Sequence, residues 1–312
     1  MLKKLFITAS LACAAWAGTA VAQEAVPSFK SSVELVPISA MVRDARGRAI
    51  TTLQAGDFEV RDNGVLRPII EFEADDQSPV TIAILLDTSG SMRLGSKLAA
   101  AREVVRRFAA DLLDGRDAVG LFTFDEGLHE LQPFTHHPAA VSDSFTDAAP
   151  FGITSLYDAV AETARRLEAQ PAGRRAIVVV TDGVDTGSTL TPSEVSARAS
   201  AIDAPVYIVA TGSKADQASY VDRAAAPNSR STTDARDLAV WTGGDLLWAT
   251  GVEDAAARAR HILAELRQQY LIAIEPASIE DWRPLEVRVR NRPRLVVRTR
   301  SGYFGRDSHS QR

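Results

Sequence analysis

The pattern of apolar and polar positions divides the chain into a centre and two flanks. In the centre, continuous apolar runs typical of strands buried on both faces alternate with amphipathic segments typical of helices. The runs cover 81–86, 118–124, 176–180 and 205–210, and the helical segments cover 97–113, 156–168 and 252–269. Strands that alternate with helices of this length predict an α/β fold with a doubly wound, mostly parallel sheet.

Both flanks alternate with a period of two, which predicts strands. In the first flank, segments 58–61 and 65–69 surround Asp62-Asn63-Gly64. Asn-Gly is a strong hairpin signal, because a type I′ turn needs positive φ at both central residues. In the second flank, segment 285–289 precedes a predicted turn and a return strand at 295–300. Since neither flank could bury a core alone, we expect them to pack together as a small antiparallel β domain.

The first residues have the features of an export signal. Lys3 and Lys4 precede a short apolar run, and Ala20-Val21-Ala22 is a small-residue cleavage site. The run is too short to cross a bilayer, which needs about 20 residues. A periplasmic or secreted protein is therefore expected. The predicted parts are a signal peptide (1–22), an N-terminal β region (23–77), an α/β domain (78–276), a C-terminal β hairpin (277–305) and a frayed tail (306–312).

Composition narrows the possible classes of protein. Hydrophobic residues make up 46% and charged residues 24% of the 312 residues, as in ordinary globular proteins. The single cysteine, Cys13, lies in the predicted signal peptide, which leaves no disulfide in the mature chain; lipidation at Cys13 is an alternative. Removing Lys3 and Lys4 changes the formal charge from −5 to −7. An acidic chain is a poor nucleic-acid binder, and no later segment is apolar enough to span a membrane.

Five oxygen-bearing side chains are expected at one edge of the sheet. Asp87, Ser89 and Ser91 directly follow the first buried run, Asp182 follows a later run, and Thr154 precedes a helix. Alternate side chains of an extended loop point the same way, so the first three should converge. Open α/β sheets bind ligands at the carboxyl ends of their strands. Three hydroxyls and two carboxylates there suit a hard cation such as Mg²⁺, and a carboxylate from another molecule would fill a vacant coordination position.

The order Asp87-x-Ser89-x-Ser91, followed by Thr154 and Asp182, resembles the metal-ion-dependent adhesion site of von Willebrand factor type A domains. The flanking segments resemble a bacterial exported subfamily first described from acidobacteria. The resemblance implies a Rossmann-like fold, a Mg²⁺ or Mn²⁺ ion, and a protein ligand that presents an aspartate or glutamate carboxylate. It also implies that Ser89 and Ser91 are direct metal ligands and that Thr154 is one in a high-affinity state. Asp87 and Asp182 would bind directly or through water.

Two other functions stay open at this point. One is a metal-dependent phosphohydrolase that uses Asp87 and Asp182, although enzymes that form an aspartyl-phosphate usually carry a second acid where this chain has Ser89. The other is a scaffold whose ion only stabilises the fold.

The remaining polar clusters have simpler interpretations. Asp185 and Asp125 are expected as solvated loop or rim residues. His136 and His137 are expected as exposed spacers, because no cysteine or carboxylate cluster beside them supports a zinc site. The arginines of 288–300 are expected on a solvated strand face that discourages edge pairing, with a site for an anion or acidic partner as the alternative.

Overall fold

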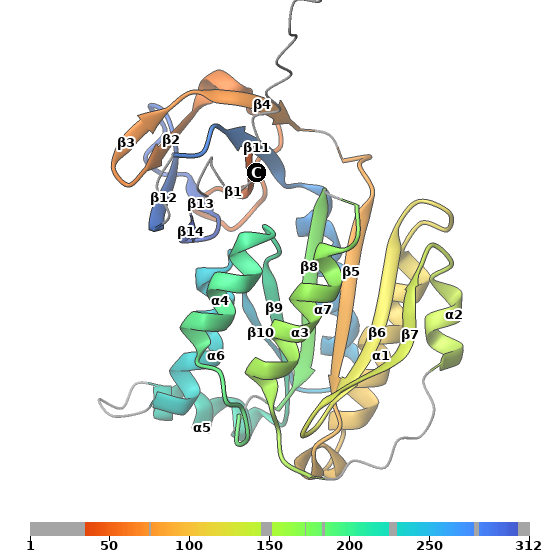
Figure 1. Ribbon diagram of the computed structural model, residues 1–312. Helices are drawn as coiled ribbons and strands as arrows, with labels where there is room; N and C mark the ends of the chain where they lie inside the picture. The colour runs from red at the N-terminus through yellow and green to blue at the C-terminus, as the bar shows by residue number, and fades with distance from the viewer. Residues whose placement is uncertain are drawn as a thin grey trace, which may run out of the picture. The chain divides into compact units, whose positions relative to one another are not determined.

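A six-stranded sheet forms the centre of the α/β domain, in the order β10-β9-β8-β5-β6-β7 (Figure 1). All neighbouring strands are parallel except β7, which runs antiparallel to β6. The inner strands are buried almost throughout, which explains their unbroken apolar runs. The strands are β5 (Val80–Asp87), β6 (Ala118–Phe124), β7 (Leu128–Thr135), β8 (Arg174–Thr181), β9 (Val206–Thr211) and β10 (Leu246–Ala249). The computed structural model describes residues 35–74, 76–144, 152–171, 173–182, 185–224, 230–277 and 281–304.

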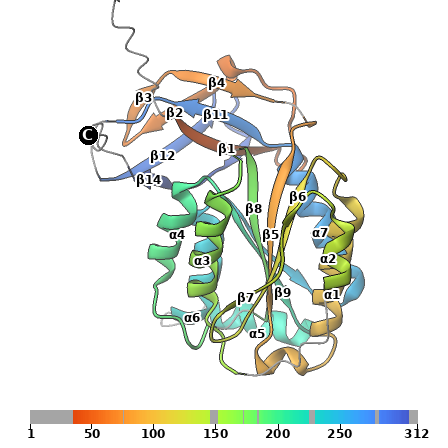
Figure 2. The same ribbon diagram turned by 45° about the vertical axis from the view of Figure 1, so that its right-hand side comes forward.

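Helices cover both faces of this sheet. Figure 2 shows α3 and α4 on one side and α1 and α7 on the other, and each pair contributes to a separate apolar cluster against the strands. The doubly wound prediction is therefore confirmed. The helices are α1 (Lys97–Asp111), α2 (Ala139–Ser144), α3 (Leu156–Glu168), α4 (Pro192–Ala201), α5 (Lys214–Ala224), α6 (Arg230–Trp241) and α7 (Val252–Arg267).

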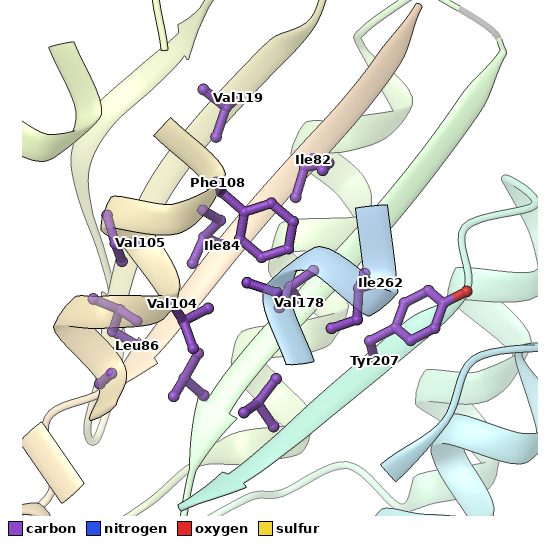
Figure 3. Close-up of a cluster of buried hydrophobic side chains, with 14 of the residues drawn as sticks. Ile82, Ile84, Leu86, Val104, Val105, Phe108, Val119, Val178, Tyr207 and Ile262 are labelled. Carbon is purple, nitrogen blue, oxygen red and sulfur yellow. The ribbon is translucent and has the colours of Figure 1, made fainter. Parts of the chain in front are cut away.

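The core on the α1 and α7 side is fully buried. Figure 3 shows Phe108 of α1 and Ile262 of α7 close to the strand side chains Ile84 and Val178. All four side chains are at most 1% exposed. Burial of this kind contributes about 1.5–3 kcal/mol per large apolar side chain, and it fixes the sheet whose ends carry the functional loops.

The flanking segments form two four-stranded antiparallel sheets, in the orders β13-β1-β11-β4 and β14-β12-β2-β3. They share one apolar cluster that includes Phe58 and Tyr270, whose ring centroids are 5.0 Å apart. The expected β domain, built from both flanks, is confirmed. Its strands are β1 (Val36–Arg43), β2 (Phe58–Asp62), β3 (Val65–Arg67), β4 (Ile69–Glu73), β11 (Tyr270–Ile274), β12 (Trp282–Val289), β13 (Val296–Arg298) and β14 (Gly302–Phe304).

The hairpin predicted around Asn63-Gly64 is present, with φ of 49° and 79° at these two residues. The prediction of a single strand over 65–69 is wrong. Pro68 interrupts this segment, since proline cannot donate to a strand ladder, and β3 and β4 belong to different sheets.

Two expectations about the C-terminal part were also wrong. Strands β12 and β13 do not form a hairpin, because β2 and β14 occupy the two edges of β12 while β13 pairs with β1. Strand β11, placed within the α/β domain from its position in the sequence, pairs instead with β1 and β4. The connection after α7 therefore leads directly into the β domain.

A buried ionic cluster joins α7 to the β domain. Glu265 of α7 pairs with both Arg43 of β1 and Arg298 of β13, and its side chain is 3% exposed. Arg298 also pairs with Asp245 at 2.9 Å. A buried carboxylate is costly without such partners, so the cluster specifies how α7 meets the two strands.

His261 makes the stability of this junction pH-dependent. Burial, followed by the charges of Arg43 and Arg298, lowers the pKa of His261 below 6.5. Glu265 lies 3.2 Å from its Nε2, but this carboxylate is already neutralised by the two arginines. Below pH 6.5 the unfolded chain therefore binds a proton that the folded chain resists, and stability falls as the pH falls.

We expect the wild-type Tm to drop more than that of His261→Gln when the pH is lowered from about 7.5 to about 5.5, across the ordinary histidine pKa. Differential scanning calorimetry at both pH values measures this. Equal drops in the two proteins would show that His261 is not the group responsible.

Candidate metal centre

Asp87 is the last residue of β5 and is 1% exposed. Leu86 pairs with Val180 in the parallel ladder, so Thr181 of β8 lies beside Asp87. The Thr181 hydroxyl donates to Asp87 Oδ2 at 2.5 Å, and the Ser89 backbone N–H donates to Oδ1 at 2.8 Å. Both carboxylate oxygens are therefore held by the protein.

Ser89 and Ser91 bring two hydroxyls together next to this carboxylate. Their Oγ atoms are 3.2 Å apart. The two hydroxyls do not converge because both residues are extended, as the sequence predicted, since only Ser89 is extended. Ser91 lies in a 3₁₀ turn, η2 (Gly90–Arg93), for which Ser89 is the N-cap. The turn, rather than an extended loop, makes the hydroxyls converge, and it leaves Ser91 half-buried at the rim.

Thr154 is held on a second loop that meets the first. The Gly90 N–H donates to Gly152 O at 3.4 Å, which links the two loops. The backbone of Thr154 bonds to Thr186 and Gly187. Its side chain is buried, and within the described part of the chain no hydrogen bond to its hydroxyl is recorded. The structure thus joins the loops of Thr154 and Ser91 but records no direct contact between their side chains.

Asp182 directly follows β8 at the same edge of the sheet. Burial is the main cause that raises the pKa of Asp87, and the Asp182 carboxylate adds to the rise. Asp182 Oδ2 accepts a hydrogen bond from Lys97 Nζ at 2.8 Å. Sequence reasoning missed both Lys97 and Thr181. A lysine at the first position of a helix was a usable signal, because the helix dipole disfavours positive charge there.

The electrostatics of the cluster suit a cation. Burial, the largest effect, raises the pKa of Asp87 above 3.8, the Asp182 carboxylate adds to the rise, and the hydrogen bonds from Thr181 and Ser89 oppose it. The Lys97 ammonium pairs with Asp182, and among the described residues Asp87 has no ion pair, so a cation would find an uncompensated carboxylate there. Hydroxyl and carboxylate oxygens are ligands that Mg²⁺ and Mn²⁺ accept. The residues therefore fit such an ion. Among the described residues, no group of three or more His, Cys, Asp or Glu side chains is placed to hold a metal ion, so a site at this edge would depend on the hydroxyls.

The other sequence candidates have structural partners. Asp185 is more than a solvated loop residue: its Oδ1 accepts from the Leu156 N–H at the start of α3 and from the Ser188 hydroxyl. His137 bonds to Asp114, and both are exposed.

The arginine face of β12 is largely neutralised by acidic residues. Arg288 pairs with Glu286 on the same strand, and on the neighbouring strand Arg61 pairs with Glu59. In the ladder, Glu286 lies opposite Arg61 and Arg288 lies opposite Glu59. This arrangement favours a solvated face over an anion site for Arg288. The same prediction is wrong for Arg298, which lies in the buried cluster with Glu265, and for Arg300, which is 2% exposed.

A cavity of about 780 Å³ lies elsewhere, lined in part by Trp241, Trp282 and Phe304. None of the five predicted metal ligands lines it. Cavity size alone therefore does not point to the cluster at the sheet edge.

Residues 82–184 match the family model of the von Willebrand factor type A domain. The chain contains a von Willebrand factor type A domain. The matched segment includes all five predicted metal ligands. A comparison with curated proteins finds no match.

One solved structure supports this fold, and a second has a lower TM-score. A von Willebrand factor type A protein from Catenulispora acidiphila is 15% identical over 88% of this chain and 76% of its own, with a TM-score of 0.51. The conserved hypothetical protein BatB from Bacteroides thetaiotaomicron is 20% identical over 59% of this chain and 98% of its own, with a TM-score of 0.47. At 15% identity, the likeness to the Catenulispora acidiphila protein shows the fold alone.

Asp185 should stabilise the von Willebrand factor type A domain without serving the metal. Asp185→Ala removes the acceptor of the Leu156 N–H, and loss of such a side-chain acceptor at a helix start costs about 0.5–2 kcal/mol. Urea unfolding measures the change in the free energy of unfolding. Asp222→Ala, an exposed position on α5, is the control and should change stability little; equal effects of both substitutions would contradict the role of Asp185.

Proposed function

We propose that the chain is an exported, non-enzymatic protein-binding module. In this proposal a Mg²⁺ or Mn²⁺ ion held by Asp87, Ser89, Ser91, Thr154 and Asp182 binds an aspartate or glutamate carboxylate of a partner protein. The periplasm or the cell exterior is the expected location. No helix within the described residues is long and apolar enough to cross a membrane.

The observation that carries the proposal is the pair of serine hydroxyls beside two acidic side chains. Ser89 and Ser91 offer oxygen ligands 3.2 Å apart. Asp87 uses both of its oxygens in hydrogen bonds within the protein, which suits a role through water. When bound, the ion would supply an electrophilic centre that a carboxylate can approach from solvent. A ligand set rich in neutral hydroxyls leaves such an ion short of negative charge, which favours an outside carboxylate.

Two apolar side chains near the cluster support a protein partner. Leu94, on the loop that carries Ser91, is 65% exposed, and Ile153, next to Thr154, is 46% exposed. Protein interfaces combine apolar contacts with a few polar anchors. These two side chains would supply apolar contact area around a metal-bound carboxylate.

The cluster is less suited to phosphoryl transfer. A nucleophilic Asp87 would have to reach a substrate, yet it is 1% exposed and both its oxygens are engaged. Turnover of an aryl phosphate that is abolished by Asp87→Asn would reverse this ranking.

Asp87→Ala should remove metal binding and leave the fold intact, because Asp87 supplies one of the two negative charges of the cluster. Isothermal titration with Mn²⁺ measures the affinity, and circular dichroism measures the secondary structure. We expect at least a tenfold loss of affinity, since one nearby charge is worth a pKa unit or more to a bound cation.

Asp125→Asn is the matched control. Asp125 follows the neighbouring strand β6 at the same rim, and its side chain bonds to the Gly127 N–H and to His129. It should keep Mn²⁺ affinity. An unchanged affinity in Asp87→Ala would overturn the metal site.

Partner capture tests the binding function itself. Purified mature protein is incubated with a cell-envelope extract in Mg²⁺, in chelator, and as Asp87→Ala. A partner retained only by the wild type in Mg²⁺ is the expected result. Partners that appear in all three samples would show that contact occurs elsewhere. If chelator lowers the Tm while no partner depends on Mg²⁺, the ion is structural.

A further inference from the structure

The ammonium group of Lys97 forms an ion pair with one of the predicted metal ligands, Asp182. Its Nζ lies 2.8 Å from Asp182 Oδ2, and the two side chains are 16% and 12% exposed. Within the described residues, no other basic side chain has a recorded contact with any of the five predicted ligands. The pair is sheltered enough that solvent and salt screen it only weakly.

The position of Lys97 in α1 makes this contact informative. Lys97 is the first residue of α1, and the helix has no acidic residue in its first turn. The N-terminus of a helix carries partial positive charge, so an ammonium group there is disfavoured unless an anion lies next to it. Asp182 is that anion. The lysine is thereby held where a divalent cation would also need the carboxylate.

We propose that Lys97 competes with the divalent cation for Asp182 and thus sets the ion concentration at which the site fills. The inference rests on the proposed metal site and concerns its regulation. A carboxylate that accepts an ammonium hydrogen bond has less charge to offer a second cation. An ammonium and a divalent ion that share one carboxylate also repel each other. A divalent ion can therefore occupy the site only if Lys97 moves away from Asp182, or if the ion binds with lower affinity beside the ammonium group.

The competition has a consequence for the metal-free protein. Without a divalent ion, Lys97 neutralises Asp182, so the empty site stays closer to charge balance. The exchange of an ammonium for a divalent ion would then let the protein respond to changes in divalent-ion concentration, rather than remaining saturated at all times.

Replacing the ammonium by a neutral side chain tests the proposal. Lys97→Met removes both charge and hydrogen bond, and Lys97→Gln keeps a donor without the charge. In isothermal titration with Mn²⁺ alone, both variants should bind about tenfold more tightly than the wild type, the effect of one nearby positive charge. Lys97→Arg, which keeps the charge, should bind no more tightly than the wild type.

Lys214→Met is the matched control. Lys214 is the first residue of α5, which follows the parallel strand β9 as α1 follows β5. The substitution removes the same charge from a helix start with no recorded contact to the five predicted ligands. Its Mn²⁺ affinity should equal that of the wild type.

Thermal unfolding supplies a second readout. In chelator, Lys97→Met should have a lower Tm than the wild type, because Asp182 loses its counter-ion, and Mn²⁺ should raise the Tm of the variant by a larger amount. If the wild type binds Mn²⁺ and Lys97→Met binds equally well or more weakly, Lys97 positions Asp182 rather than competing, and only this inference fails. If neither protein binds Mn²⁺ while both remain folded, the proposed metal site fails with it.

Discussion

Parallel pairing of β5 with β6 on one edge and β8 on the other decides where the functional loops begin. Because Leu86 lies opposite Val180, the two strands end level, and Thr181 reaches the carboxylate of Asp87. The residues that follow the two strands, such as Ser89 and Asp182, then lie at the same edge of the sheet. A shift of the ladder by a single residue would turn Asp87 to the other face of the sheet and separate it from its partners. The apolar clusters on both faces hold this register.

This register is held by buried apolar side chains, and a polar side chain can be buried among them only if it is hydrogen-bonded. Asp87 and Asp182 lie where this buried region ends. Asp87 remains inside because Thr181 and Ser89 satisfy its oxygens. Asp182 is half-buried and can face both protein and solvent. The difference in burial fits two chemically equal side chains for different tasks. Asp87 organises the loop that carries the hydroxyls, and in the proposed function Asp182 would exchange Lys97 for a divalent ion.

Much of the architecture follows from local sequence patterns. The predicted helix 156–168 has the bounds of α3, and the Asn63-Gly64 hairpin forms, because periodicity and turn chemistry act over a few residues. The pairing of β13 with β1 could not be predicted from local patterns. It depends on which strand, far away in the sequence, has an unpaired edge in the folded chain. The order of the five site residues was readable, whereas the contact between Lys97 and Asp182 depends on how α1 meets the end of β8. The role of the five site residues as metal ligands stays a prediction.

The interleaving of the β domain determines when it can form. Val36 of β1 pairs with Ile274, and Phe58 of β2 pairs with Val289. These pairs can form only after almost the whole chain has been synthesised. Contacts at such long sequence separation slow folding, because closing a long loop must precede the pairing. The α/β sheet has no such delay, as its strands between Val80 and Ala249 pair among themselves. During synthesis, β1 and β2 therefore present open strand edges to other chains until β11 and β12 emerge, after the last strand of the central sheet.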